Sequence, residues 1–154
     1  MLDGMKPYDE RLTVPRLWWL IAALGVALLG VTLVPLGIVP MLAGVAAGSA
    51  LVAVALNSYG SVRIRVTAGS LVAGQARLPL EALGEAFALD AEQAAAWRTH
   101  RADARAFMLL RGYVPTAVRV EVTDPADPTP YLYLSTRHPD RLVSVLRAAR
   151  PAAG

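Results

Sequence analysis

The sequence predicts an α+β membrane protein in which a two-helix transmembrane hairpin is followed by a small antiparallel β barrel or sandwich with a C-terminal helix. Three observations support this fold class. Of the 154 residues, 55% are hydrophobic and only 18% are charged, whereas soluble proteins carry about 25% charged residues. The 46 residues from Leu17 to Val62 contain no Asp, Glu, Lys, Arg or His. The rest of the chain has short alternating segments separated by turn residues, as in a β-rich domain.

The chain divides into three predicted parts: a cytosolic N-terminal tail over 1–15, the transmembrane hairpin over 16–57, and a cytosolic β domain over 60–150. One crossing takes about 20 apolar residues, so the uncharged stretch is long enough for two. Prolines interrupt it within 35–40 and are expected to end one helix before the next begins. We therefore predict spans at about 17–34 and about 40–57. Both are apolar on all sides, as lipid-facing or fully buried helices are.

The flanking residues predict the orientation of the hairpin. Cations lie on both flanks, and the connecting loop carries no charge. By the positive-inside rule, we expect a multi-pass protein of the inner (plasma) membrane with both termini in the cytoplasm. Lys6 belongs to the N-terminal flank, and the predicted interface residues are Trp18, Trp19, Tyr59, Arg11, Arg16, Arg63 and Arg65. A cleaved signal peptide and a helical hairpin inside a soluble core are the alternatives, but the second apolar run and the small remainder of the chain favour the membrane hairpin.

The second span contains a GxxxG pattern formed by Gly44 and Gly48. Two glycines four residues apart let another helix backbone approach closely. They can serve homodimerisation, they can pack against the first span of the same chain, or the pattern can arise by chance in a segment rich in Gly and Ala. Packing within the chain or chance is favoured over homodimerisation.

The β domain is expected to contain about seven short strands. Period-two alternation or short apolar runs between turns predict them, at 61–67, 70–73, 75–80, 84–89, 106–110, 117–123 and 131–136. The segment 106–110 is expected to be fully buried, and Arg119 and Glu121 are expected on a solvent face. A short helix over 91–98 is capped by Asp90, and a C-terminal helix opens at Pro139. Prolines make 124–130 a connecting loop.

Several short patterns resemble a known family. They are Tyr8-Asp9-Glu10-Arg11-Leu12 before Pro15, Leu71-x-x-Gly74-x-x-x-Leu78-Pro79, Asp103-x-x-Ala106, the segment 120–131, and Ser135-Thr136-Arg137-x-Pro139. The layout is similar to that of bacterial membrane proteins that join a two-helix hairpin to a pleckstrin-homology-like domain. It more closely resembles an actinobacterial family, domain of unknown function 3093. The resemblance implies that residues 60–150 are pleckstrin-homology-like, and it transfers no catalytic residues.

Residues capable of catalysis are few. The chain has no cysteine, which excludes disulfides and thiol nucleophiles, and it lacks the G-x-S-x-G, Walker and G-x-G-x-x-G patterns. His100 and Asp103 could form a general-base pair, but an exposed loop histidine is the favoured interpretation. Asp124 and Asp127 fit turns better than a cation site. We therefore predict no catalytic residue, no metal site and no cofactor.

The predicted function is that of a non-enzymatic, membrane-anchored binding or scaffolding module. The alternatives are an accessory subunit of a cell-envelope or transport complex and, last, a membrane-surface enzyme that uses His100 and Asp103. The expected partners are the lipid bilayer and either another membrane protein or a second copy, bound through the hairpin. Nucleic acid is not expected, because the net charge of +3 comes from dispersed arginines. Arg63, Arg65 and Arg77 could attract anionic lipid, or they could form an ordinary solvated strand face.

Overall fold

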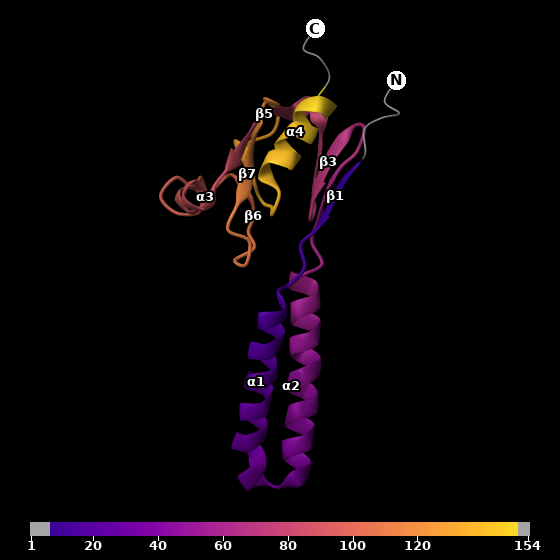
Figure 1. Ribbon diagram of the computed structural model, residues 1–154, viewed down its shortest axis with the longest axis vertical. Coiled ribbons are helices and arrows are strands. Elements are labelled where there is room, and N and C mark those ends of the chain that lie inside the picture. Colours follow the sequence, from indigo (N-terminus) through magenta and orange to yellow (C-terminus); the bar gives the residue numbers. More distant parts are fainter. Residues whose placement is uncertain (1–6, 151–154) are drawn as a thin grey trace. The chain divides into compact units, whose positions relative to one another are not determined.

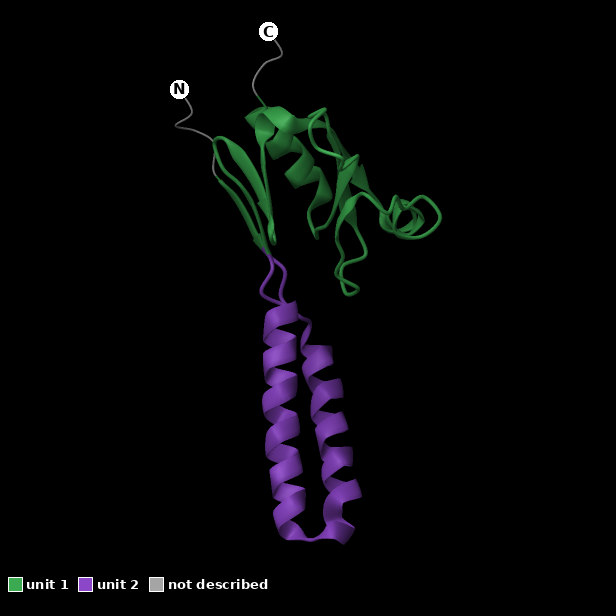
Figure 2. Cartoon of the chain, turned by 180° about the vertical axis from the view of Figure 1, so that it is seen from behind, with its two compact units in different colours: residues 1–10, 63–154 green, residues 11–62 purple. Residues whose placement is uncertain are grey.

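A computed structural model describes residues 7–150 of the chain, so the predicted tail is described only from Pro7 onward and Lys6 lies outside the described residues. The chain divides into two compact units (Figure 2). One consists of residues 11–62, and the other combines residues 1–10 with 63–154. The second unit is therefore built from chain segments on both sides of the first.

The unit of residues 11–62 is a helical hairpin. Helix α1 (Arg16–Leu33) is followed by a short 3-10 turn, η1 (Val34–Leu36), and by α2 (Ile38–Tyr59). Gly37 makes the turn with φ at +108°, a conformation that favours glycine. Helix α2 begins two residues before the predicted boundary because Pro40 lies in its first turn, where no helical amide is required.

The hairpin contains two helices that are long and apolar enough to cross a membrane, over residues 16–36 and 38–59. Very little of either helix is buried. Leucine, isoleucine and valine side chains instead point outward along both helices, including Leu20, Ile38 and Leu51. The core helix of a soluble protein would bury such side chains.

The first sheet of the β domain, sheet A, has the strand order β1-β2-β3-β4. Its strands are β1 (Tyr8–Arg11), β2 (Arg63–Val66), β3 (Ser70–Ala73) and β4 (Ala76–Pro79). β2, β3 and β4 follow one another as antiparallel hairpins, and Gly74 takes a positive φ in the second turn. β1 lies within residues 1–15, for which the sequence predicts a tail and no strand.

The second sheet, sheet B, has the order β5-β7-β8-β6. Its strands are β5 (Leu83–Leu89), β6 (Phe107–Leu109), β7 (Ala117–Val122) and β8 (Tyr131–Ser135). A short 3-10 turn, η2 (Leu80–Ala82), leads from β4 into β5. β6 pairs with β8 in parallel, so sheet B is not purely antiparallel. β6 is an edge strand, and Phe107 and Met108 are only partly buried. Leu110, just beyond the strand, is 39% exposed, so the predicted full burial of 106–110 was wrong.

Two helices cover sheet B on opposite faces, and the layers run in the order α3, sheet B, α4 and sheet A (Figure 1). Helix α3 (Ala91–Arg98) starts with a capping box formed by Asp90 and Gln93. Its Ala94 joins a small apolar cluster with Tyr131 and Tyr133. Helix α4 (Pro139–Ala149) buries Leu142, Val143 and Leu146. β8 is consequently buried along its whole length. The predicted α+β class with two apolar helices, β-sheets and a C-terminal helix is confirmed.

Candidate membrane interface

Aromatic side chains mark the ends of the helical hairpin at which the chain enters and leaves it. The rings of Trp18 and Tyr59 stack with their centroids 6.1 Å apart and their planes inclined by 21°. Trp18 and Trp19 remain 40% and 43% exposed. Arg16, at the start of α1, is also exposed. Rings with an apolar body and a polar edge favour the boundary between lipid and water.

Exposed arginines follow on the strands that lead into and out of the hairpin. Arg11 ends β1, and Arg63 and Arg65 lie on β2, all with exposed side chains. The Arg65 guanidinium forms an ion pair with Asp9 at 3.3 Å, with both side chains 47% exposed. Such a pair contributes at most about 1 kcal/mol. The predicted interface residues therefore form two groups, with Arg11, Arg63 and Arg65 on sheet A and the others on the hairpin.

The two glycines of the GxxxG pattern face α1 of the same chain. A Cβ atom added at Gly44 would overlap the side chain of Leu33, and one added at Gly48 would meet Leu29 Cδ2 at 3.1 Å. On the opposing helix, a Cβ at Gly30 would meet Val45 Cγ2 at 3.0 Å. The structure thus uses this groove for close packing of α1 against α2.

The β domain contains a buried carboxylate that was not predicted from the sequence. Glu10 on β1 is only 9% exposed. Its Oε2 accepts hydrogen bonds from Tyr8 Oη at 2.6 Å and from Thr136 Oγ1. Its Oε1 accepts one from the backbone N–H of Arg137 at 2.9 Å. A buried carboxylate needs such donors because it can only accept hydrogen bonds.

This Glu10 cluster, formed by Tyr8, Glu10, Thr136 and Arg137, joins β1 to the segment between β8 and α4. The N–H of His138 donates to Thr136 Oγ1 at 3.1 Å, which orients the hydroxyl group. Burial and the hydrogen bond to the Glu10 carboxylate raise the pKa of Tyr8 well above its usual value. Two patterns that stand far apart in the sequence, Tyr8–Leu12 and Ser135–Pro139, are therefore in contact. The only local signal was the alternation of Tyr8, Glu10 and Leu12, with a charged residue at an inward position.

Arg119 is the centre of a second cluster, on the face of sheet B that α3 covers. Its guanidinium carbon lies 4.5 Å from the ring centroid of Trp97 and 4.6 Å from that of Phe87. Glu121 Oε1 lies 3.6 Å from Arg119 Nη1, and the Arg119 side chain is only 18% exposed. The predicted solvent position for Arg119 was wrong, because Trp97 of α3 covers this part of the sheet. Stacked between two rings, the arginine joins α3 to β5 and β7 through cation–π contacts.

His100 and Asp103 do not hydrogen-bond to each other. Asp103 Oδ1 accepts from the backbone N–H of Arg105 at 2.9 Å, and Oδ2 lies 3.3 Å from Arg105 Nη2. These hydrogen bonds lower the pKa of Asp103. The exposed His100 places Nδ1 3.3 Å from Thr99 Oγ1. The Asp103 carboxylate therefore stabilises the turn at Arg105 and does not orient the imidazole of His100.

The carboxylates of the proline-rich loop stabilise turns. Asp124 Oδ1 accepts from the N–H of Ala126 at 2.9 Å, and Asp127 Oδ1 accepts from the N–H of Thr129 at 2.9 Å. The second hydrogen bond lowers the pKa of Asp127. Within residues 7–150, no three His, Asp or Glu side chains come together as metal ligands.

Comparison with known proteins gives a family for this chain and no relative of known activity. No curated protein and no solved structure matches it. A family model matches residues 7–146, a range that includes both the hairpin and the β domain. It also includes the Glu10 cluster, whose members come from the two ends of the matched range. The chain belongs to the family described as protein of unknown function, DUF3093.

Proposed function

We propose that this chain is a non-enzymatic binding or scaffolding module, anchored in the plasma membrane by its hairpin and carrying a pleckstrin-homology-like domain in the cytosol. The pairing of β1 with β2 is the observation that carries the proposal. β1 precedes α1, β2 follows α2, and the two strands are neighbours in sheet A. The N–H of Leu12 continues this contact by donating to the carbonyl of Val62 at 3.0 Å.

The strand pairing supports two crossings of the membrane. Neighbouring strands of one sheet must lie on the same side of a bilayer, since an open sheet edge is not tolerated in hydrocarbon. A chain that leaves this side through α1 must therefore return through α2. Cleavage after α1 would remove β1 from the domain, and with it Tyr8 and Glu10 of the Glu10 cluster, which argues against a signal peptide. The cations flanking both helices favour the cytosolic side.

The arrangement of sheets and helices in the β domain supports the pleckstrin-homology-like assignment. Two four-stranded sheets with a C-terminal helix, α4, between them are consistent with the architecture that the family resemblance implies. The inner faces of both sheets and one face of α4 form its core, through Ile64, Leu71, Val120, Leu132 and Leu146.

A binding role is favoured over catalysis because the polar groups that the sequence offered for catalysis already stabilise local structure. Asp103 holds a turn through Arg105, and Glu10 is saturated by donors from its own domain. Neither carboxylate is positioned to take a proton from a bound substrate.

A role as accessory subunit of a membrane complex is the second candidate. A shallow groove runs along the hairpin between its helices, lined by Trp19 and by small side chains such as Ala22, Ala23, Ser49 and Ala53. Small residues on the lipid-facing surface of a helix favour close approach by another transmembrane helix. Crosslinking in native membranes followed by mass spectrometry would identify a stoichiometric partner if this role is correct.

The placement can be tested with single cysteines, because the natural chain has none. Leu36→Cys marks the turn of the hairpin, and Ala126→Cys marks an exposed loop of the β domain. We expect a membrane-impermeant maleimide to label Leu36→Cys in intact spheroplasts and Ala126→Cys in inverted vesicles. Labelling of Ala126→Cys in intact spheroplasts would overturn the proposal. The cysteine-free chain is the control for background labelling.

A further inference from the structure

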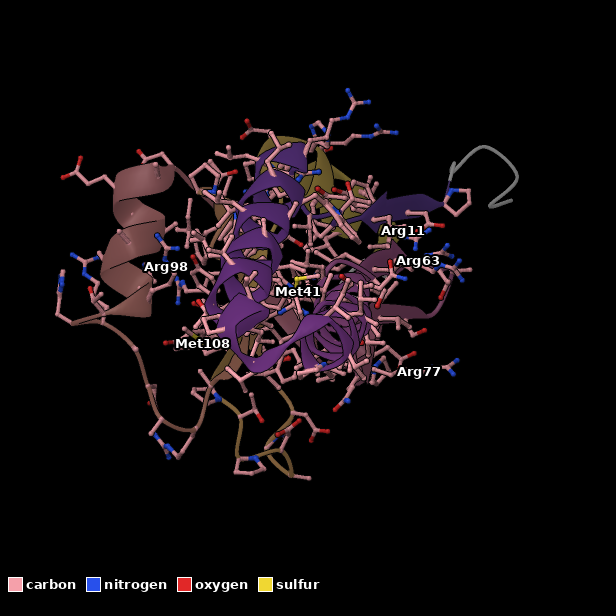
Figure 3. All side chains as sticks on the ribbon, turned by 90° about the horizontal axis from the view of Figure 1, so that it is seen from below. Arg11, Met41, Arg63, Arg77, Arg98 and Met108 are labelled. Atoms are coloured by element: carbon pink, nitrogen blue, oxygen red, sulfur yellow. The ribbon has the colours of Figure 1, made fainter. Side chains whose placement is uncertain are left out.

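The outer face of sheet A collects arginines from three of its four strands. Arg11 comes from β1, Arg63 and Arg65 from β2, and Arg77 from β4, and all four side chains are exposed. Arg65 is paired with Val72 of β3, and Val72 with Arg77, so these three residues form one row across the sheet. Figure 3 shows Arg11, Arg63 and Arg77 on one side of the molecule. We call these four residues the arginine face.

The opposite face of the same sheet is apolar and buried. Ile64 and Val66 of β2 and Leu71 and Ala73 of β3 are at most 3% exposed. Sheet A is therefore half-buried, with its inner face fixed by the domain core. Between the arginines, the outer face carries short side chains such as Ser70 and Val72, which leave the guanidinium groups accessible.

The arginine face carries more cations than anions, because its four arginines share the outward positions of β1 to β4 with one carboxylate, Asp9. On the arginine face, Asp9 pairs with Arg65, while Arg11, Arg63 and Arg77 form no ion pair with any residue in the described part of the chain. The face therefore presents an excess of positive charge, and an anionic partner complements it.

We propose that the arginine face binds the phosphate headgroups of anionic phospholipids in the membrane that holds the hairpin. The inference rests on the proposed membrane placement. Guanidinium groups suit phosphate because their N–H groups form a planar fork that can bind two oxygens at once. The negative surface of the cytoplasmic leaflet attracts such side chains when they lie close to it.

Chain connectivity favours lipid over a soluble anionic partner. Arg11 precedes Arg16, at the start of α1, by five positions, and Arg63 follows Tyr59, at the end of α2, by four positions. Fully extended, these connections reach about 18 Å and about 14 Å. Two arginines of the face are thus held near the helix ends by the chain itself, where lipid phosphates are the most abundant anions.

The test uses the full chain in lipid nanodiscs, with an environment-sensitive fluorophore on Val72→Cys, which lies between Arg65 and Arg77. We expect a blue-shifted, brighter emission in discs of mixed phosphatidylcholine and phosphatidylglycerol than in phosphatidylcholine discs, and its loss at high salt. Removing two charges with Arg65→Gln/Arg77→Gln should lower the ratio of bound to free domain about 25-fold, at about fivefold per arginine.

The matched control is Arg105→Gln/Arg147→Gln, which removes the same charge and also breaks ion pairs, but elsewhere on the domain. The proposal predicts that this control keeps the response to phosphatidylglycerol. An equal loss in both double variants, or a response only to added RNA or to an acidic protein, would overturn it. Incorporation of the chain into nanodiscs tests the membrane anchor separately. A chain that incorporates without responding to phosphatidylglycerol refutes the lipid-binding face alone.

Discussion

Removal of the buried carboxylate of Glu10 is the most informative perturbation of this fold. Glu10→Ala takes the acceptor from three donors, Tyr8 Oη, Thr136 Oγ1 and the N–H of Arg137. Tyr8 Oη and Thr136 Oγ1 lie 3.3 Å apart and can still bond to each other. The second hydroxyl and the N–H of Arg137 then lose the Glu10 acceptor, each at a cost of about 1–3 kcal/mol unless another acceptor replaces it, and the charge-assisted bonds are lost. We expect the free energy of unfolding to fall by about 3 kcal/mol.

Two further variants separate the charge of this side chain from its position on β1. Glu10→Gln keeps the size and one acceptor, so it should cost about half as much as the truncation. Asp9→Ala removes the neighbouring carboxylate, whose exposed ion pair with Arg65 contributes at most about 1 kcal/mol.

Urea unfolding in detergent micelles measures the difference. With Trp18→Phe and Trp19→Phe as background, Trp97 is the only remaining tryptophan, since the chain has three, and it reports on the β domain alone. At the urea dependence typical of a small domain, the midpoint for Glu10→Ala should fall by about 2 M. If Glu10→Ala lowers the midpoint no more than Asp9→Ala does, the cluster does not hold β1 in place.

Three other variants test separate parts of the structure. The pKa of Tyr8 is raised above its usual 10.0, so the folded domain holds this proton more tightly than the unfolded chain does. The domain should therefore lose stability as the pH rises above 10.0. In urea midpoints measured across alkaline pH, Tyr8→Phe should make this loss smaller. Gly44→Val should push the hairpin helices apart, because the new side chain would collide with Leu33. Gly25→Val is the control, since a Cβ at Gly25 meets nothing within 4 Å. Thermal melts in micelles should show a large destabilisation for Gly44→Val and almost none for Gly25→Val. Asp90→Ala removes the N-cap of α3 and should cost about 1 kcal/mol; hydrogen exchange of α3 amides that is no faster than in the natural chain would contradict this role.

Most strands could be predicted from the sequence because their polarity alternates with the pleat of the sheet. β2 and β7 show this pattern clearly, and the two apolar helices follow from length and absence of charge. β1 was missed because its inward position holds Glu10, a charged residue that hides the alternation. The hydroxyl group of Thr136, which donates a hydrogen bond to the buried carboxylate, is 126 residues away in the sequence. A local sequence pattern does not predict such a contact.

The environment of Arg119 could not be predicted for a related reason. Alternation along β7 places its side chain on the face opposite Val118 and Val120, and that face is solvated in a two-layer domain. Here α3 adds a further layer, and Trp97 covers the guanidinium. Local periodicity identifies the face of a strand, but the element that packs on this face is a property of the whole fold.

The position of β1 also determines the order in which the molecule can be completed. β1 is synthesised before the hairpin, and its neighbour β2 only after it. In effect, the two helices of the hairpin are an insertion into the loop between two adjacent strands of a single sheet. β1 therefore stays without its neighbour β2 until both helices have been synthesised. If the hairpin crosses the membrane as proposed, sheet A can close only after both helices have crossed, and a chain whose second helix fails to insert leaves Glu10 apart from its donors Thr136 and Arg137.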